Sequence, residues 1–430
     1  MKKTQGRTMS RTLGLACVLV ITSLIFGSAI ARADVVLDWN AIAVDTAIQN
    51  GTNPFTQARD AAIVQLAVFE AVNSITGDYQ PYLGTVVAPP GASAEAAAAQ
   101  AAHDVLVTYF QNSQVTLDQQ LAASLALIPN GQSKTDGIAT GHAAAAAMIV
   151  LRANDGSFPL TLYTPGSPGP GVWQATPSCP VIGGVARGLF FNWKDVTPFG
   201  IPDAHAYLLD PPAALTSNTY AKAYNEVMTV GSLASTERPQ DRANVAIFYA
   251  SSSPTYVFNL AGRQVSQESW HSLSENARAF ALVNMAISDS LVASFYNKYH
   301  YVWWRPETAI HNGDIDGNPK TEPDPSWAPF IVTPCFPSYP SNHGSGSNGG
   351  AEVLRRLYGA AGHSITISNP AVPNIVLQYT SFKQITDDIS DARVYGGIHF
   401  RTDQDAGANL GRAIGTAVYK NNLRAMHGSE

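Results

Sequence analysis

The sequence has 430 residues, of which 45% are hydrophobic and 13% charged, and its formal net charge is −6 at pH 7. This length is enough for one large domain or for two fused bundles, each with its own core. Because the acidic balance comes without a basic tail, nucleic acid is disfavoured as a partner, and any place where positive side chains gather becomes informative.

Residues 1–33 have the pattern of a secretory signal peptide. A basic start leads into an apolar run from Leu13 to about Ile30, and Ala31-Arg32-Ala33 is a small-x-small cleavage pattern. We expect cleavage near Ala33 and a secreted or periplasmic protein, with an uncleaved membrane anchor as the alternative. We expect no later stretch to span a bilayer. Removing the five basic residues of this leader leaves 21 Lys and Arg against 32 acids, a balance of −11.

Two cysteines, Cys179 and Cys335, remain after the expected cleavage, because Cys17 lies in the leader. In an oxidising compartment the two could form a disulfide, and the sequence leaves this open. Two cysteines so far apart make a zinc site unfavourable.

The first half of the chain is rich in alanine, with apolar residues three and four positions apart, which predicts amphipathic helices. The predicted helices are 37–49, 56–74, 93–110, 116–127 and 134–154. The segment 156–212 is rich in proline, glycine and aromatic residues, and we interpret it as a long ordered loop that covers another part of the protein.

The helical pattern returns in the second half, at 217–231, 238–250, 264–299, 346–358, 381–394 and 399–423. Only 364–368 and 371–377 are candidate strands. The sequence therefore predicts an all-α fold of two adjoining helical bundles with long connecting loops. We predict a signal peptide (1–33), an N-terminal helical region with its covering loop (34–215) and a C-terminal helical domain (216–424).

Three polar segments of the second half carry the candidate chemistry. In "KYHYVWWRPETAIH", Lys298 and Arg305 are seven residues apart, which places both cations near one face if the helix continues to Pro306. Aromatic neighbours indicate a partly buried region, where cations need an anion. Surface salt bridges are the alternative interpretation.

The second segment, "FPSYPSNHGSG", places Ser341, Asn342 and His343 where a helix begins. Free backbone N–H groups at a helix N-terminus bind oxyanions, and the helix dipole helps them. Ser341 can add a hydroxyl and His343 an imidazole. A plain capping turn is the alternative.

The third segment, "ARVYGGIHFRTD", contains Arg393, His399 and Asp403. Asp403 follows His399 by four residues, so its carboxylate could orient the ring and set its tautomer. A structural turn is the alternative for this fragment alone. Together the three segments hold the groups that grip a tetrahedral oxyanion: guanidinium forks, an ammonium, helix-end amides and histidines.

These segments resemble the signature of the vanadium-dependent haloperoxidase and type 2 phosphatidic acid phosphatase superfamily. Its pattern is Lys, six residues and Arg-Pro, then Pro-Ser-Gly-His, then Ser-Arg, five residues, His, three residues and Asp. The matches here run from Lys298 to Pro306, from Pro340 to His343 and from Arg393 to Asp403, in the same order. The stretches "LDWNAIAVDTAI", "TPFGIP" and "ERPQDRANVAIFY" also resemble secreted bacterial members of the haloperoxidase-like branch.

The resemblance implies a role for each matched residue. The side chains of Lys298, Arg305 and Arg393 would bind oxygens of vanadate or phosphate, as would Ser341 and the amide of Asn342. His399 would be the vanadium ligand of a peroxidase, or the nucleophile of a phosphatase. His343 would act as general acid and base, and Asp403 would support His399.

Two departures from the pattern matter for this site. Asn342 replaces the usual glycine, so it could narrow the pocket or add a donor, and Ala392 replaces the serine before Arg393. An acidic residue of the fungal chloroperoxidase-like members is also replaced here by serine, near Ser251 and Ser252.

The resemblance leaves the reaction open between halide oxidation by hydrogen peroxide and hydrolysis of a phosphate ester, because vanadate and phosphate share charge and shape. Phe295 and Phe336 match aromatic wall positions of the haloperoxidases, and such walls exclude water. We therefore favour a vanadium haloperoxidase-like enzyme. A secreted acid phosphatase acting through a phosphohistidine and a non-catalytic oxyanion-binding protein are the alternatives.

Overall fold

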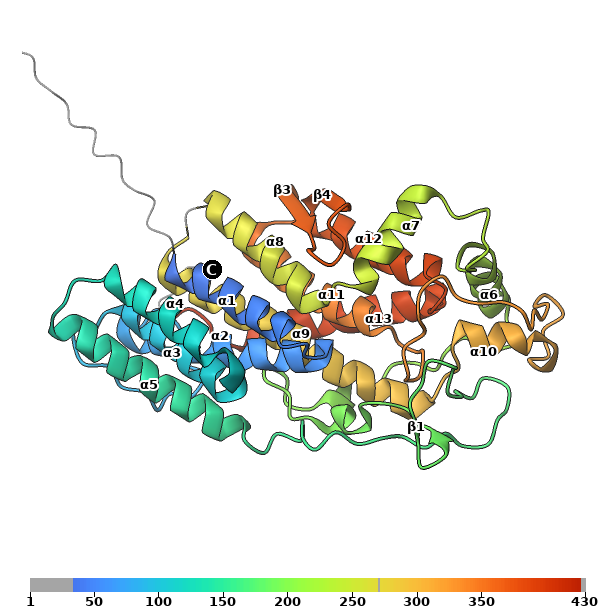
Figure 1. The fold of residues 1–430 in the computed structure, drawn as a ribbon, viewed down its shortest axis with the longest axis horizontal. Helices are drawn as coiled ribbons and strands as arrows, with labels where there is room; N and C mark the ends of the chain where they lie inside the picture. The colour runs from blue at the N-terminus through green and yellow to red at the C-terminus, as the bar shows by residue number, and fades with distance from the viewer. Residues whose placement is uncertain (1–33, 270, 427–430) are drawn as a thin grey trace, which may run out of the picture. The chain divides into compact units, whose positions relative to one another are not determined.

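The computed structural model describes residues 34–269 and 271–426, and the predicted signal peptide lies outside these described residues. The described residues form one compact unit. The described part is mostly helical with two short hairpins, so the all-α prediction is confirmed (Figure 1). The domain boundary near residue 215 stays a prediction.

The first five helices agree with the predicted ones to within two residues at most ends. They are α1 (Val35–Gln49), α2 (Pro54–Thr76), α3 (Ala94–Tyr109), α4 (Gln114–Ala126) and α5 (Gln132–Arg152), with the short 3-10 helix η1 (Gln111–Ser113) before α4. Alanine and glycine let α3 and α5 approach closely. A Cβ placed on Gly141 of α5 would stand 2.6 Å from the carbonyl oxygen of Ala97 of α3.

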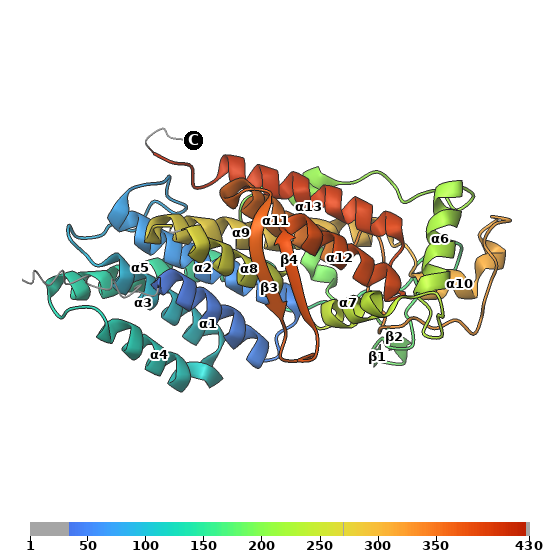
Figure 2. The same ribbon diagram turned by 90° about the horizontal axis from the view of Figure 1, so that it is seen from above.

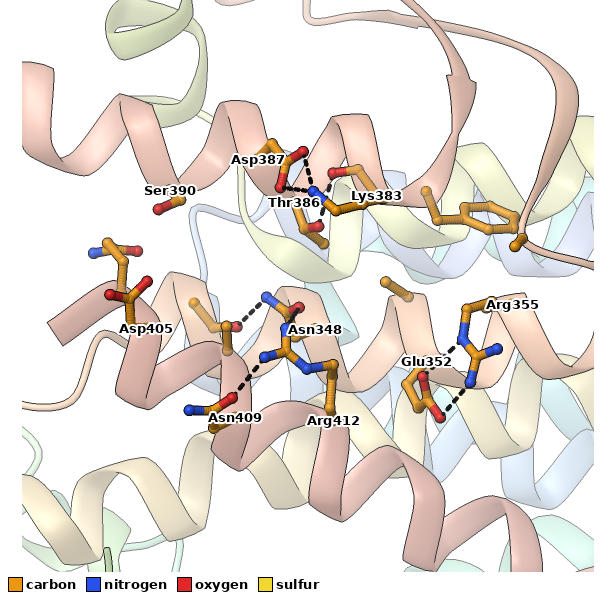
Figure 3. A pocket seen from close by; sticks show the side chains of 16 residues that line it. Asn348, Glu352, Arg355, Lys383, Thr386, Asp387, Ser390, Asp405, Asn409 and Arg412 are labelled. Atoms are coloured by element: carbon orange, nitrogen blue, oxygen red, sulfur yellow. Dashed lines mark hydrogen bonds and ion pairs between the residues drawn. The ribbon is translucent and has the colours of Figure 1, made fainter. Parts of the chain in front are cut away.

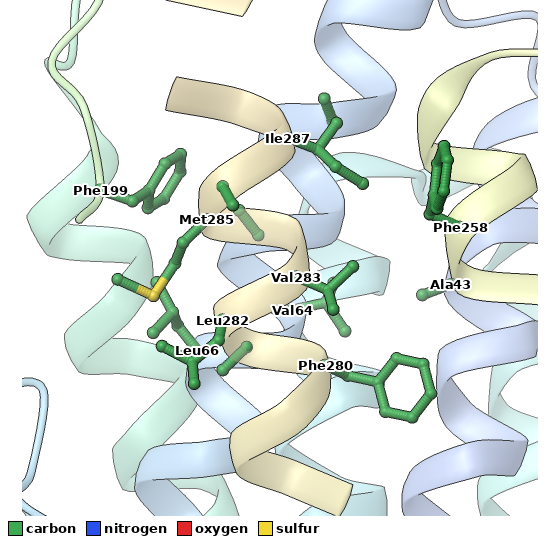
Figure 4. Close-up of a cluster of buried hydrophobic side chains, with 14 of the residues drawn as sticks. Ala43, Val64, Leu66, Phe199, Phe258, Phe280, Leu282, Val283, Met285 and Ile287 are labelled. Atoms are coloured by element: carbon green, nitrogen blue, oxygen red, sulfur yellow. The ribbon is translucent and has the colours of Figure 1, made fainter. Parts of the chain in front are cut away.

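Helix α9 (Leu273–Tyr301) is the central element of the core, and it packs against α2, α11 and α13. Figure 4 shows its apolar side chains, among them Leu282, Val283 and Met285, facing neighbouring helices on more than one side. Contrary to our expectation, this helix is long and apolar enough to cross a membrane. However, 94% of the relevant window is buried inside the protein, as in the core helix of a globular domain.

The single helix predicted at 264–299 is wrong, because two helices occupy this region. Helix α8 (Pro254–Ser269) begins ten residues earlier, and α9 begins after it at a capping box. The side chain of Ser272 accepts the N–H of Glu275, and the Glu275 carboxylate accepts the N–H of Ser272. This reciprocal pair starts a new helix inside the stretch that we predicted as one.

The C-terminal helices are α11 (Asn342–Tyr358), α12 (Phe382–Tyr395) and α13 (Arg401–Asn421). Gly407, Gly411 and Gly415 form a stripe on α13 that faces α11, and a Cβ on Gly411 would stand 2.1 Å from the carbonyl oxygen of Ser345. The stripe therefore lets the first turns of α11 lie directly against α13.

The remaining elements lie around these helices. They are α6 (Asn218–Val230), α7 (Gln240–Ala250), α10 (Pro306–His311), η4 (Gly313–Ile315), and the antiparallel pair β3 (Ala361–Ser368) and β4 (Val376–Ser381). Figure 2 shows the β3–β4 hairpin beside α8 and α12. The predicted strand 371–377 is wrong over most of its length, because 369–375 forms the turn and the strand follows it.

The covering loop, residues 156–212, has little regular structure, as predicted. It contains β1 (Val181–Ile182), β2 (Val185–Ala186), η2 (Phe191–Asp195) and η3 (Ala204–Tyr207). The buried carboxylate of Asp289 on α9 accepts the N–H groups of Phe199, Gly200 and Ile201 at 2.7 to 3.0 Å. Asn297 accepts the N–H of Leu209 at 2.8 Å. Side chains of α9 thus hold the loop at two points.

A disulfide joins Cys179 of the covering loop to Cys335, which resolves the pairing that the sequence left open. The two cysteines pack with the fully buried ring of Trp173. Since the bridge closes a loop of 156 residues, removing it in a Cys179→Ser, Cys335→Ser variant is expected to lower the free energy of unfolding by about 4 kcal/mol.

Denaturant unfolding with and without a thiol reductant measures this effect. The wild-type protein should lose stability on reduction, whereas the double serine variant should not respond. An unchanged wild-type midpoint after both thiols have been freed and counted would contradict the prediction.

Candidate active site

The three polar segments of the sequence meet at the end of α9 and the beginnings of α11 and α13. Helix α9 ends at Tyr301, and Val302 has a left-handed conformation with φ of 49°, so the helix does not continue to Pro306 as we had assumed. Arg305 instead lies at the N-cap of α10. Lys298 and Arg305 nevertheless both reach the segment 336–340.

The segment 336–343 leads into α11, which begins at Asn342 and not at Gly346 as predicted. The Ser341 side chain caps the helix by accepting the N–H of Gly344 at 3.1 Å, while its own N–H donates to the carbonyl oxygen of Asp403 at 3.0 Å. The capping interaction thus fixes the start of α11 beside the start of α13.

His399 lies just before α13 and is held between an acid and a guanidinium. Its Nδ1 is 2.9 Å from Asp403 Oδ2, and its Nε2 is 2.9 Å from Nη1 of Arg305. Because the guanidinium can only donate, Nε2 carries the lone pair and Nδ1–H donates to Asp403. Burial first, and then the charges of Arg305, Lys298 and Arg393, hold the pKa of His399 well below its usual value. The ring is therefore neutral, with Nε2 as its nucleophilic or metal-binding atom.

Lys298 uses all three of its ammonium hydrogens on backbone carbonyls. Nζ donates to the oxygens of Pro337, Ser338 and Pro340 at 2.8, 2.7 and 2.5 Å. Burial, together with the charge of Arg305, lowers the pKa of Lys298 well below its usual value. In this structure Lys298 positions the segment before α11, and its predicted direct contact with an oxyanion stays a prediction.

Several buried donors at this place have no hydrogen-bond partner among the described residues: Arg305 Nη2, Arg393 Nε and Asn342 Nδ2. Burial lowers the pKa of Arg305 to about 9 and that of Arg393 to about 10, which shows how poorly the two cations are solvated. The carboxylate of Asp403, which contacts His399, is buried beside these cations, and burial raises its pKa to about 6. Unpaired buried donors beside excess positive charge fit a bound oxyanion.

The side chain of Asn342 has a defined orientation. Its Oδ1 accepts the hydroxyl of Ser294 on α9 at 2.7 Å, which leaves Nδ2 as the free donor. We expected Asn342, in place of the usual glycine, either to narrow the pocket or to add a hydrogen-bond donor. The free Nδ2 supports the added donor.

Four of the polar residues of this site line a cavity of about 550 Å³. We call these four, Asn342, His343, Arg393 and His399, the floor of the cavity. The rest of the lining is almost entirely apolar: Pro54, Phe55, Phe190, Ala250, Pro254, Leu291, Phe330, Ile331, Val332, Pro334 and Phe336.

Of the two predicted wall residues, Phe336 lines the cavity, while Phe295 lies behind it. The ring of Phe295 is fully buried, with its centroid 5.4 Å from that of Phe336 and 4.6 Å from that of Phe55. Phe55 and Phe190 also line the cavity, from α2 and the covering loop, and no motif in the sequence pointed to either.

A second cavity, of about 700 Å³, lies between α11, α12 and α13 and has a different character (Figure 3). Two pairs of its charged side chains form ion pairs, Lys383 with Asp387 and Glu352 with Arg355. Arg412 donates to the side-chain oxygens of Asn348 and Asn409, at 3.0 and 2.6 Å. Among the described residues, the cations that line this second cavity, Arg355, Lys383 and Arg412, all have partners, whereas Arg393 at the floor has an unpaired Nε.

His343 lies in the first turn of α11 and faces the cavity. Its Nε2 donates to the carbonyl oxygen of Ser252 at 3.2 Å. The backbone at Ser252 thus accepts this hydrogen bond, near the position where the resemblance implied an acidic residue in the fungal chloroperoxidase-like members. Burial, and then the charge of Arg393, hold the pKa of His343 well below its usual value. His343 is therefore neutral in this structure.

This depressed pKa predicts a pH effect on stability. Below about pH 6.5 the unfolded chain binds a proton at residue 343 that the folded protein does not, so the free energy of unfolding falls as the pH falls. For His343→Gln, the loss of stability between pH 6.5 and 5.5 is expected to be smaller than in the wild type by about 1 kcal/mol. Chemical denaturation without oxyanion at both pH values measures it, and equal losses in the two proteins would contradict it.

The fold and the floor define a class of protein: a helical protein whose buried cationic floor suits a tetrahedral oxyanion. Residues 278–428 match the family model described as the VCPO second helical-bundle domain. The resemblance to the vanadium-dependent haloperoxidases that the three segments predicted is confirmed.

Individual relatives agree with this assignment. The vanadium chloroperoxidase of Curvularia inaequalis is 26% identical over 200 residues, a match that covers 39% of this chain and about a third (32%) of that protein's length. A bacterial vanadium-dependent iodoperoxidase has a similar structure, with a TM-score of 0.74 at 23% identity over 92% of this chain and 98% of that one. The holo form of a bacterial vanadium-dependent chloroperoxidase gives 0.69 at 17% identity, over 86% and 91%. At such identities the structures show a shared fold.

Proposed function

We propose that the chain is a vanadium-dependent haloperoxidase-like enzyme that oxidises halide with hydrogen peroxide. One observation carries the proposal: His399 and the unpaired donors of Arg393 and Asn342 belong to the floor of an apolar cavity, and Arg305 contacts His399 Nε2 beside it. The donors suit the oxygens of vanadate, and neutral imidazole is a good ligand for its metal.

When bound, vanadate supplies the activation of hydrogen peroxide towards halide without a change in the metal's oxidation state. His399 Nε2 would hold the metal, and the N–H of Arg305 that now occupies Nε2 at 2.9 Å would be free to donate to an oxygen of the anion. Asp403 keeps Nδ1–H in place and so preserves the tautomer of His399.

The overall reaction consumes one proton, as hydrogen peroxide, halide and H⁺ give hypohalous acid and water. A bound anion would offset the charge of Arg393 and so raise the pKa of His343, which could then take up a proton and return it to a leaving oxygen. The two arginines neutralise the anion, and the aromatic walls keep bulk water away from the floor.

A phosphatase acting through a phosphohistidine at His399 is the second candidate, because the floor would hold phosphate equally well. A non-catalytic oxyanion-binding protein is the third. The apolar cavity above the floor favours the first candidate, since a weakly hydrated halide tolerates such walls better than a hydrated phosphate ester does.

Two assays on one preparation separate these functions. Metal-stripped protein should brominate a dye with peroxide and bromide only after vanadate is added. Turnover of p-nitrophenyl phosphate that vanadate inhibits, with no bromination, would replace the proposal by the phosphatase. Tight vanadate uptake with neither reaction would leave a binding protein.

We also propose that the protein is exported by its N-terminal leader to the periplasm or the outside of the cell. The disulfide between Cys179 and Cys335 supports this proposal, because such bonds persist in oxidising compartments. Fractionation of cells that express the full chain, followed by N-terminal sequencing, tests it; full-length protein in the cytoplasm would contradict it.

A further inference from the structure

The cavity above the floor is far larger than the proposed reaction needs. Its volume is about 550 Å³, whereas a water molecule in the liquid takes about 30 Å³, and halide and hydrogen peroxide are each of that order. Cavities of roughly 300 to 1,000 Å³ are typical of sites for organic ligands. The apolar lining gives water few partners, so the remaining space suits an apolar molecule.

The walls of the cavity are aromatic and come from separate parts of the chain. Phe55, Phe190 and Phe336 all line it, and the ring of Phe55 stands edge-on to that of Phe190, with centroids 4.8 Å apart. Aromatic pairs of this kind form rigid surfaces on which another ring packs well.

Phe190 also has an unusual backbone. Its φ is 59°, in the left-handed region that a bulky residue rarely adopts at no cost. Strain of this kind persists where the surroundings enforce it, and it gathers at ligand sites. Here it allows the covering loop to place an aromatic ring in the wall.

The mouth of the cavity is apolar as well. Val332 lines it and is 76% exposed, and Phe330 and Ile331 precede it. An apolar ligand could pack against these exposed and lining side chains while its reacting atom lies near the polar floor.

We propose that this cavity binds a small apolar aromatic compound as the acceptor, which is halogenated while bound. The inference rests on the proposed function, which supplies hypohalous acid at the floor. In the step, the C–H bond of the arene and the O–X bond break, a C–X bond forms, and the released proton joins the hydroxide to give water.

The first test is binding without reaction. Titration of the vanadate-loaded and the metal-stripped protein with 2-naphthol, without peroxide, should give saturable binding in a calorimeter. Phe190→Gly removes the ring at a position whose φ suits glycine, and it should weaken binding about tenfold. Val332→Asp should weaken binding at least about fivefold. Val150→Asp is the matched control, because Val150 is also 76% exposed and does not line the cavity, and it should leave binding unchanged.

The second test is selectivity. Bromination of an equal mixture of 2-naphthol and the polar phenol 4-hydroxybenzoate by the enzyme is compared with bromination by free hypobromite. A product ratio shifted at least about fivefold towards naphthol, and lost in Val332→Asp, supports the inference. A ratio equal to that of hypobromite, or naphthol binding that neither cavity variant changes, overturns it while the proposed function stands. Binding weakened by the variants, with no bromination under any condition, supports the apolar ligand and overturns the proposed function.

Discussion

His399→Ala is expected to reduce vanadate-dependent bromination at least about 100-fold, to the rate of the solution without enzyme. Loss of a group that merely supports a metal ligand costs about 10- to 100-fold, and His399 would be the ligand itself. The variant also removes the lone pair that accepts the N–H of Arg305. Vanadate affinity, measured by calorimetry on stripped protein, should fall with the activity.

His205→Ala is a suitable control for this variant. The His205 side chain is about half exposed and packs on Tyr296, outside the cavity lining. It should retain wild-type affinity and rate. Halogenation that survives in His399→Ala would remove His399 from the proposed site.

Asp403→Asn is expected to lower the free energy of unfolding by about 3 kcal/mol at pH 8, where the carboxyl group is ionised. The charges of Lys298 and Arg305, both buried, act on Asp403, and removing one partner of a buried ionic group leaves the other charges uncompensated. Denaturant unfolding of the vanadate-free proteins measures the difference.

The same variant should bind vanadate about 10- to 100-fold more weakly, because the amide holds His399 Nδ1–H less firmly. In the wild type, vanadate at 100 times its Kd should raise the free energy of unfolding by about 2.7 kcal/mol. Asp405→Asn is the matched control, two residues along α13 on an exposed side chain, and should change neither quantity. An Asp403→Asn protein as stable as the wild type would show that Asp403 does not balance the buried cations.

Most of the helices could be predicted from the sequence, because alanine-rich segments with apolar residues at helical spacing leave little choice. The wrongly predicted helix boundaries lie where a local interaction decides whether the helix starts or ends. The capping box at Ser272 starts a new helix inside a stretch that we predicted as one, and the left-handed Val302 ends a helix although Trp303 and Trp304 follow it. Apolar spacing records neither a capping interaction nor a single φ angle, so it could not place these boundaries.

The residues of the candidate site could be predicted from the sequence, but their contacts could not. Spacing and resemblance named Lys298, Arg305, Arg393 and His399, and the structure brings all four together; their chemical roles remain predictions. That Lys298 donates to three carbonyl oxygens depends on the path of another segment. Two residues of the aromatic wall, Phe55 and Phe190, were missed for the same reason, since both lie more than one hundred residues before the floor in the chain.

The attachment of the covering loop bears on how fast molecules exchange with the cavity. The loop is pinned to α9 by the Asp289 carboxylate and by Asn297, and to the segment before Phe336 by a covalent bond. The covering loop is therefore held in place at several points and does not open as a lid. Arrival and departure should follow simple one-step kinetics, with no slow isomerisation of the protein ahead of them.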